Sequence, residues 1–233
     1  MFIAHIRKDD VEQSVEQHLC GVANLCEQFG AKLELSCLAR LIGSLHDAGK
    51  YTAAFQEYIC YSYLHPEDRR RKGKIPHSLQ GALYLCKRFD SGEPPGRTAA
   101  AAALCIASHH SGLMDCISPT GELVFYQQLQ RDDPKLYYAE SRENFLKEYP
   151  LKKELDTLFA GATEEMKAIT QRLREQKLFS NFSMHLAVRF LFSCLIDADR
   201  YETYCFMAGQ LPLPTPSPPW KMYLNRLEAH LSR

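Results

Sequence analysis

The sequence lacks several features, and each absence excludes a class of function. It has no run of about 18 apolar residues, so we expect no membrane-spanning helix. It has no GxxxxGK[ST] phosphate-binding loop, so we expect no ATPase motor within it. It also has no excess charge, because Lys+Arg and Asp+Glu both number 28. This balance excludes a global attraction for nucleic acid or for an anionic membrane, and any basic patch must be local.

The nine cysteines do not form the pattern of a disulfide framework. Their number is odd, and no CxxC pair occurs. Several of them, such as Cys26, Cys105 and Cys194, sit among apolar residues with helical spacing. The first ten residues become charged too soon for the apolar stretch of a secretory signal. We therefore expect a cytoplasmic protein whose reduced thiols pack as small hydrophobic side chains.

Helical periodicity dominates what is present. Apolar residues recur at helical spacing, Thr52 is a candidate helix N-cap, and no segment shows sustained alternation with a period of two. The pattern predicts an all-α fold with helices near residues 11–29, 33–47, 53–59, 78–89, 97–108, 135–149, 151–176 and 181–201.

The chain length suits one sizeable domain, which we place at residues 1–210. Residues 211–219 hold five prolines in nine positions, which is typical of a stiff linker. A short amphipathic helix is predicted over residues 220–233. The expected organisation is therefore one helical domain followed by a linker and a terminal helix, at 211–233.

The segment LIGSLHDAGK carries the first candidate chemistry. Its helix has an apolar side that His46 continues at the C-terminal end, and Asp47 follows directly. An imidazole and a carboxylate at a helix end can bind one cation, and the carboxylate can bridge to a second. Gly49 is expected to let the chain turn sharply, and Lys50 could reach a phosphate oxygen. The alternative is an ordinary polar cluster at a helix end.

Further histidines and acids lie in or beside the predicted helices. His109 and His110 end an apolar helix, where they could also serve as capping residues. His18 lies on an apolar helix face, where a satisfied core histidine is the commoner case, and His77 could be a polar helix start. His185 is interpreted as a core residue, whereas His5, His65 and His230 lie near chain ends or in a loop.

Two aspartates interrupt an apolar helix in SCLIDADRYET. A buried, unpaired carboxylate is unfavourable, so either a cation or an ion pair should accompany one of them. Asp197 and Asp199 project about 200° apart on a helix, so they should not share a metal. The candidate ligands are five imidazoles and two carboxylates: His18, His46, Asp47, His77, His109, His110 and one of Asp197 and Asp199. Such a set suits two transition-metal ions that activate water for phosphoester hydrolysis.

The order of these motifs resembles the HD nuclease of type I CRISPR systems, a branch of the HD phosphohydrolase superfamily. The resemblance covers about residues 1–205, and HHSG at 109–112 and DAD at 197–199 are its more specific elements. It implies a helical bundle with a metal site in its core. It also implies a single-stranded DNA nuclease that uses Mn, Ni, Co or Fe. This nuclease would work with a helicase domain or subunit and, through it, with the CRISPR surveillance complex.

Carried over by motif, the resemblance assigns a role to each candidate residue. One metal would be held by His18, His46, Asp47 and Asp199. The second would share Asp47 and be held by His77, His109 and His110. Asp199 is preferred to Asp197 because HD proteins generally place this ligand after alanine. Asp47 and Lys50 would be the catalytic residues, Lys50 through phosphate contact or proton donation.

Two other functions remain open from the residues alone. The chain could be an HD phosphohydrolase that acts on nucleotides or cyclic dinucleotides, or a non-catalytic module whose metals stabilise the fold while it docks onto a helicase. The basic run at residues 69–74 could guide a DNA backbone, although such runs are often only solvated loops.

Overall fold

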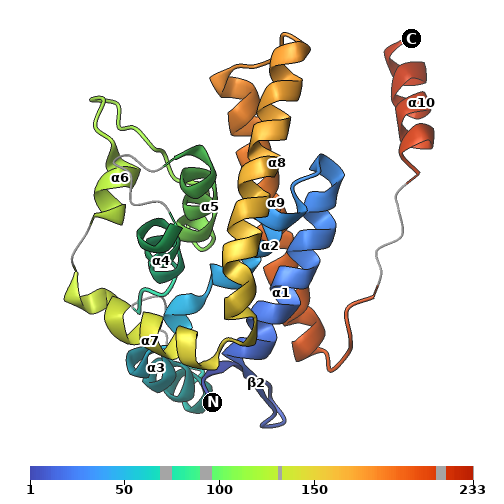
Figure 1. Ribbon diagram of the computed structural model, residues 1–233. Coiled ribbons are helices and arrows are strands. Elements are labelled where there is room, and N and C mark those ends of the chain that lie inside the picture. The colour runs from blue at the N-terminus through green and yellow to red at the C-terminus, as the bar shows by residue number, and fades with distance from the viewer. Residues whose placement is uncertain (69–74, 90–95, 131–132, 214–218, 233) are drawn as a thin grey trace.

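The computed structural model describes residues 1–68, 75–89, 96–130, 133–213 and 219–232. The basic run at 69–74 lies outside these residues. Helices account for most of the described chain, which confirms the predicted all-α class (Figure 1). The helices are α1 (Val15–Gly30), α2 (Ser36–Leu45), α3 (Ala53–Leu64), α4 (Leu79–Phe89), α5 (Arg97–Ser108), α6 (Val124–Leu129), α7 (Tyr138–Glu148), α8 (Leu155–Glu175), α9 (Asn181–Met207) and α10 (Trp220–Leu231).

Helix α2 is the centre of the bundle. It packs against α1, α5, α8 and α9, and every residue from Leu41 to Leu45 is buried. Figure 1 shows α8 and α9 running beside α1 and α2, while α4 and α5 lie on the opposite side of α8. A helix that is apolar on nearly all sides must be enclosed by others. The C-terminal end of α2, where His46 follows Leu45, therefore lies inside the protein.

The N-terminus forms a two-stranded antiparallel hairpin, β1 (Ile3–Ile6) and β2 (Glu12–Ser14), that the periodicity did not predict. Because β2 occupies residues 12–14, the first helix also begins later than the predicted start at residue 11. Val11 is 41% exposed, and α1 begins only after Ser14. Ser14 and Gln17 form a reciprocal capping box at this point. Such a box fixes the helix start more strongly than one apolar residue does.

Other boundaries also differ from expectation. The short helix α6 was not predicted, and α9 continues to Met207, beyond the expected end at 201. Thr52 is the N-cap of α3, as predicted, and its Oγ1 accepts a hydrogen bond from the N–H of Phe55. The helix α10 contains no buried residue. The domain boundary after residue 210 stays a prediction.

The structure also gives the surroundings of the apolar side chains. Cys26, Cys105 and Cys194 are buried among the helices. Within the described residues, no helix combines the length and the apolar character needed to cross a membrane.

Candidate metal centre

The candidate residues come from helix ends and from one long helix that meet at the C-terminal end of α2. His46 is the C-cap residue of α2, and His109 is the C-cap residue of α5. His18 lies in the first turns of α1, and Asp199 lies on α9. Asp47 is almost completely buried, at 1% exposed. The fold thus brings together residues that are up to 181 positions apart in the chain, from 18 to 199.

One group of donor atoms consists of His18, His46, Asp47 and Asp199. The Nε2 atom of His18 lies 3.3 Å from Oδ2 of Asp47 and 3.4 Å from Oδ1 of Asp199. The Nε2 atom of His46 lies 3.4 Å and 3.7 Å from the same two oxygens. Two imidazole nitrogens and two carboxylate oxygens therefore surround one point in the core.

A second group lies on the other side of the Asp47 carboxylate. Its Oδ1 atom is 3.2 Å from Nε2 of His109, 3.9 Å from Nε2 of His110 and 4.0 Å from Nε2 of His77. The Nε2 atoms of His77 and His110 are 2.6 Å apart. Asp47 thus turns one oxygen toward each group. The same carboxylate therefore belongs to both groups of donor atoms.

The histidines present lone pairs to these points because their other nitrogens are already bonded. Nδ1 of His46 donates to the carbonyl of Gly43 at 2.9 Å, and Nδ1 of His109 donates to that of Ile106 at 2.7 Å. With Nδ1 protonated and bonded, Nε2 is the atom that binds a metal once the ring loses its second proton. The Nε2 atoms of His18 and His46 are buried and lack a hydrogen-bond partner among the described residues. These orphaned nitrogens fit a divalent metal.

The electrostatics of the centre also favour positive charge. Burial and Lys50 lower the pKa of His18, but the adjacent carboxylates of Asp199, Asp47 and Glu202 outweigh them and raise it to about 10. Burial lowers the pKa of His46, and the charges of Asp47 and Asp199 raise it to about 9. Burial raises the pKa of Asp47, but Lys50 and His46 together hold it well below its usual value. The Asp47 carboxylate is therefore ionised and attracts cations.

Lys50 and His5 close the centre on the side of the hairpin. The Nζ atom of Lys50 lies 2.8 Å from Oδ2 of Asp47 and 3.4 Å from Nε2 of His5. The ring of His5 packs edge-on against His18, with centroids 4.9 Å apart. Burial and the charges of Lys50 and His18 lower the pKa of His5 to about 2, so it is neutral. Sequence reasoning left His5 at a chain end, because nothing local shows that strand β1 folds back onto α1.

Glu202 is a second residue that sequence reasoning missed. Its Oε2 accepts a hydrogen bond from Nδ1 of His18 at 2.6 Å, and its Oε1 accepts one from Nε2 of Gln13 at 2.5 Å. Glu202 lies three residues after Asp199, so both face the cluster from one side of α9. That spacing was a usable signal once Asp199 had been chosen.

The orientation of α9 places Asp197, Asp199 and His185 in different surroundings. Asp199 faces the cluster, whereas Asp197 is exposed. The interpretation of His185 as a core residue is wrong, because His185 is exposed. The buried side of α9 carries Leu191, Leu195 and Ala198, and the first turns of the helix lie largely at the surface. An apolar composition therefore did not mean burial there.

The centre opens to solvent through a pocket of about 400 Å³. Four members of the candidate centre line it: Asp47, Lys50, His110 and Asp199. The other lining residues are His5 from the hairpin and Arg200, Thr203 and Tyr204 from α9. A substrate can therefore reach both groups of donor atoms from one side.

Comparison with known families agrees with this geometry. The family model described as HD domain matches residues 15–155, more than half of the chain. The chain belongs to the HD domain family. This is a superfamily of metal-dependent hydrolases, and HD domains bind divalent metal ions. The matched range includes all the candidate residues except Asp199, which is carried by α9.

A curated relative gives a narrower likeness. The chain is 38% identical over 79 residues to the CRISPR-associated nuclease/helicase Cas3 of Haloferax volcanii. The matched segment is 34% of this chain and 8% of that protein. The chain thus matches a small part of a much longer relative.

Proposed function

We propose that this HD domain is a metal-dependent nuclease that hydrolyses phosphodiester bonds of single-stranded DNA in type I CRISPR interference. A helicase in the same chain or in a separate one would deliver the strand. The observation that carries the proposal is the shared Asp47 carboxylate, which offers one oxygen to each of two groups of imidazoles. The partial likeness to a CRISPR-associated nuclease/helicase supports it.

The residues divide between two divalent ions, drawn from Mn, Ni, Co and Fe. His18, His46, Asp47 and Asp199 would hold one ion, and Asp47, His77, His109 and His110 would hold the other. Such a pair, when bound, activates water and stabilises the attacking and leaving oxygens of a phosphodiester. Lys50, which lines the pocket, would donate a hydrogen bond to a phosphate oxygen.

Two lining residues of the pocket favour a strand over an isolated phosphate. Arg200 is exposed beside Asp199 and can pair with a neighbouring phosphate. Tyr204 is 59% exposed, and its ring is free to stack on a base. Both residues lie on α9, four positions apart, so they form one side of the pocket mouth. A phosphate contact next to a stacking ring is the combination that single-stranded nucleic acids use.

The decisive experiment measures cleavage of circular single-stranded DNA with Mn. Asp47→Ala is expected to lower the rate by at least about 100-fold, because it removes the oxygen shared by both ions. Asp197→Ala is the matched control, since Asp197 is an exposed aspartate on α9, and it should leave the rate unchanged. Equal activity of Asp47→Ala and the wild type would overturn the proposal.

The same preparation separates the other functions. If free nucleotides or cyclic dinucleotides are hydrolysed far faster than DNA is cleaved, the protein is a nucleotide phosphohydrolase rather than a nuclease. Metal uptake without hydrolysis of any phosphodiester would instead identify a non-catalytic module. Elemental analysis after anaerobic purification would identify the metal.

A further inference from the structure

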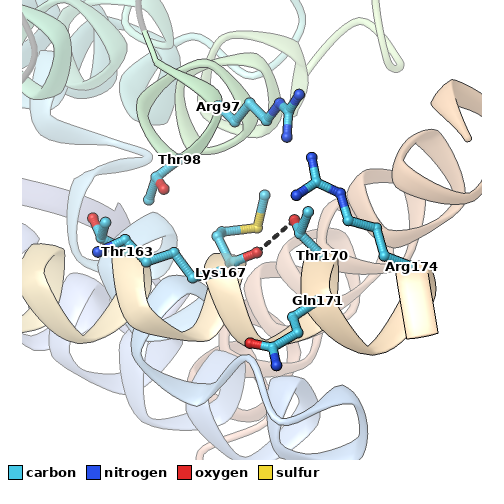
Figure 2. Close-up of a pocket in the computed structure, with 8 residues that line it drawn as sticks. Arg97, Thr98, Thr163, Lys167, Thr170, Gln171 and Arg174 are labelled. Atoms are coloured by element: carbon cyan, nitrogen blue, oxygen red, sulfur yellow. Dashed lines mark hydrogen bonds between the residues drawn. The ribbon is translucent and has the colours of Figure 1, made fainter. Parts of the chain in front are cut away.

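A groove with no role in the proposed reaction lies between the start of α5 and the C-terminal half of α8 (Figure 2). Its volume is about 490 Å³, within the range of pockets for small ligands. Arg97 and Thr98 line it from α5, and Thr163, Met166, Lys167, Thr170, Gln171 and Arg174 line it from α8. Three of these residues are cationic, and none is acidic.

The two arginines face each other from opposite sides of the groove. Figure 2 shows the guanidinium groups of Arg97 and Arg174 pointing toward one another across the groove. Both lie over the ring of Phe179, at 5.6 Å and 4.9 Å from its centroid. Within the described residues, neither arginine forms an ion pair, whereas Lys167 pairs with Glu164 at 2.7 Å. Two like charges held in this way attract an anion between them.

A threonine and a helix start also line the groove. Thr98 is only 8% exposed, and its hydroxyl can donate a hydrogen bond. Helix α5 begins at Arg97, and its N-cap Gly96 provides no side-chain cap for the first N–H groups. The N-terminal end of a helix adds partial positive charge for an anion.

We propose that this groove binds a phosphate group, carried by a nucleotide or by a nucleic-acid strand. A phosphate has enough oxygens to accept from both guanidinium groups and from the Thr98 hydroxyl at once. The site is separate from the metal centre. Helix α5 is 12 residues long and runs from Arg97 at the groove to Ser108, next to His109 at the centre, a rise of about 18 Å. The inference therefore does not depend on the proposed nuclease activity.

The test is calorimetric titration of the full 233-residue chain with inorganic phosphate, without added metal. We expect one phosphate per chain, with an affinity that Arg97→Ala and Arg174→Ala each weaken at least about tenfold. Arg174→Lys should fall between the wild type and Arg174→Ala, because it keeps the charge and loses the two-pronged donor. Arg142→Ala is the matched control, since Arg142 is an exposed arginine on α7 outside the groove, and it should bind as the wild type does.

Two further arms identify the source of the phosphate and keep the sites apart. Tighter binding of a thymidine octanucleotide than of thymidine monophosphate identifies a strand, and the reverse identifies a free nucleotide. Hydrolysis of bis(p-nitrophenyl) phosphate with Mn should be unchanged in Arg97→Ala and Arg174→Ala. No binding of phosphate, or equal affinity in these variants and the wild type, would overturn the proposal. A parallel loss of hydrolysis would also contradict it, because the groove would then not be separate.

Discussion

Histidines at two helix ends both pair a backbone carbonyl and orient a ring nitrogen toward the centre. The last carbonyls of an α-helix have no partner within the helix. At the ends of α2 and α5, His46 and His109 each donate from Nδ1 to the carbonyl three residues earlier. This bond satisfies a carbonyl and fixes the ring with Nε2 turned toward the centre. The HD and HH motifs are therefore helix endings that also supply candidate metal ligands.

The orientation of His18 depends on Glu202 rather than on a helix end. We predict that Glu202→Ala weakens metal affinity about 10–100-fold, because Nδ1 of His18 loses the acceptor that fixes its tautomer. Glu202→Gln should recover part of the affinity, since its amide oxygen can still accept. Competition with a chelating dye measures the effect. Glu143→Ala, on an exposed face of α7, is the control, and equal losses in both alanine variants would refute a specific role.

Metal uptake should release protons, because the pKa values of His18 and His46 are raised from 6.5 to about 10 and about 9. A raised pKa stabilises the metal-free fold fully below pH 6.5, and this contribution is lost as pH rises through 9 to 10. Metal affinity should therefore increase over the same range. At pH 7, calorimetry in buffers of different ionisation enthalpy should detect release of about two protons. Heats that do not depend on the buffer would contradict this prediction.

The candidate ligands could be predicted from the sequence, but the residues that contact and orient them could not. His46, Asp47, His109 and His110 stood out because paired polar residues end strongly apolar helices. His5 and Glu202 did not, because their roles arise only when β1 and α9 pack against α1. The local sequence contains no information on that packing.

At the scale of elements, Gly49 allows the segment after α2 to pack closely against the start of α4, which the sequence did not indicate. It was expected to permit a sharp turn, yet it is not among the glycines with positive φ. A Cβ at this position would instead overlap the backbone of His77 and the side chain of Gln80. The glycine is therefore required because two segments approach closely, and one of them carries His77.

We predict that Gly49→Ala destabilises the fold by about 1–3 kcal/mol, as overpacking of a filled core does. It should also lower hydrolysis more than the loss of folded protein explains, because His77 must move away from Asp47. Thermal unfolding and activity at a temperature where the variant is folded would separate the two effects. Gly161→Ala, where only the side chain of Cys37 is in the way, should leave the activity unchanged.

Helices were predictable where apolar spacing and end signals agreed. The interval 97–108 and the Thr52 cap matched α5 and α3. The hairpin before α1 was missed because its strands have only four and three residues, too few for an alternating pattern. The short α6 was missed for the same reason. Length, more than residue type, limited the prediction of elements.

At the scale of the molecule, the candidate metal centre joins helices that contact one another mainly through apolar side chains. His18, His46, His109 and Asp199 come from four different elements, α1, α2, α5 and α9 or their ends. Metal ligands that are distant in sequence bind the ion only in the folded chain, so binding stabilises the fold. The centre should therefore contribute to stability whatever substrate the enzyme takes.

Chelation should accordingly lower the unfolding temperature. A metal present at 100 times its dissociation constant stabilises a protein by about 2.7 kcal/mol, and each kcal/mol shifts the midpoint by about 2–4 °C at this size. We expect chelator treatment to lower the midpoint by roughly 5–10 °C, and added Mn to restore it. Asp47→Asn should abolish the shift, because both groups of donor atoms use this carboxylate, while Asp197→Asn should retain it. If neither chelator nor added metal changes the midpoint temperature of unfolding, the buried histidines and aspartates do not form a metal centre.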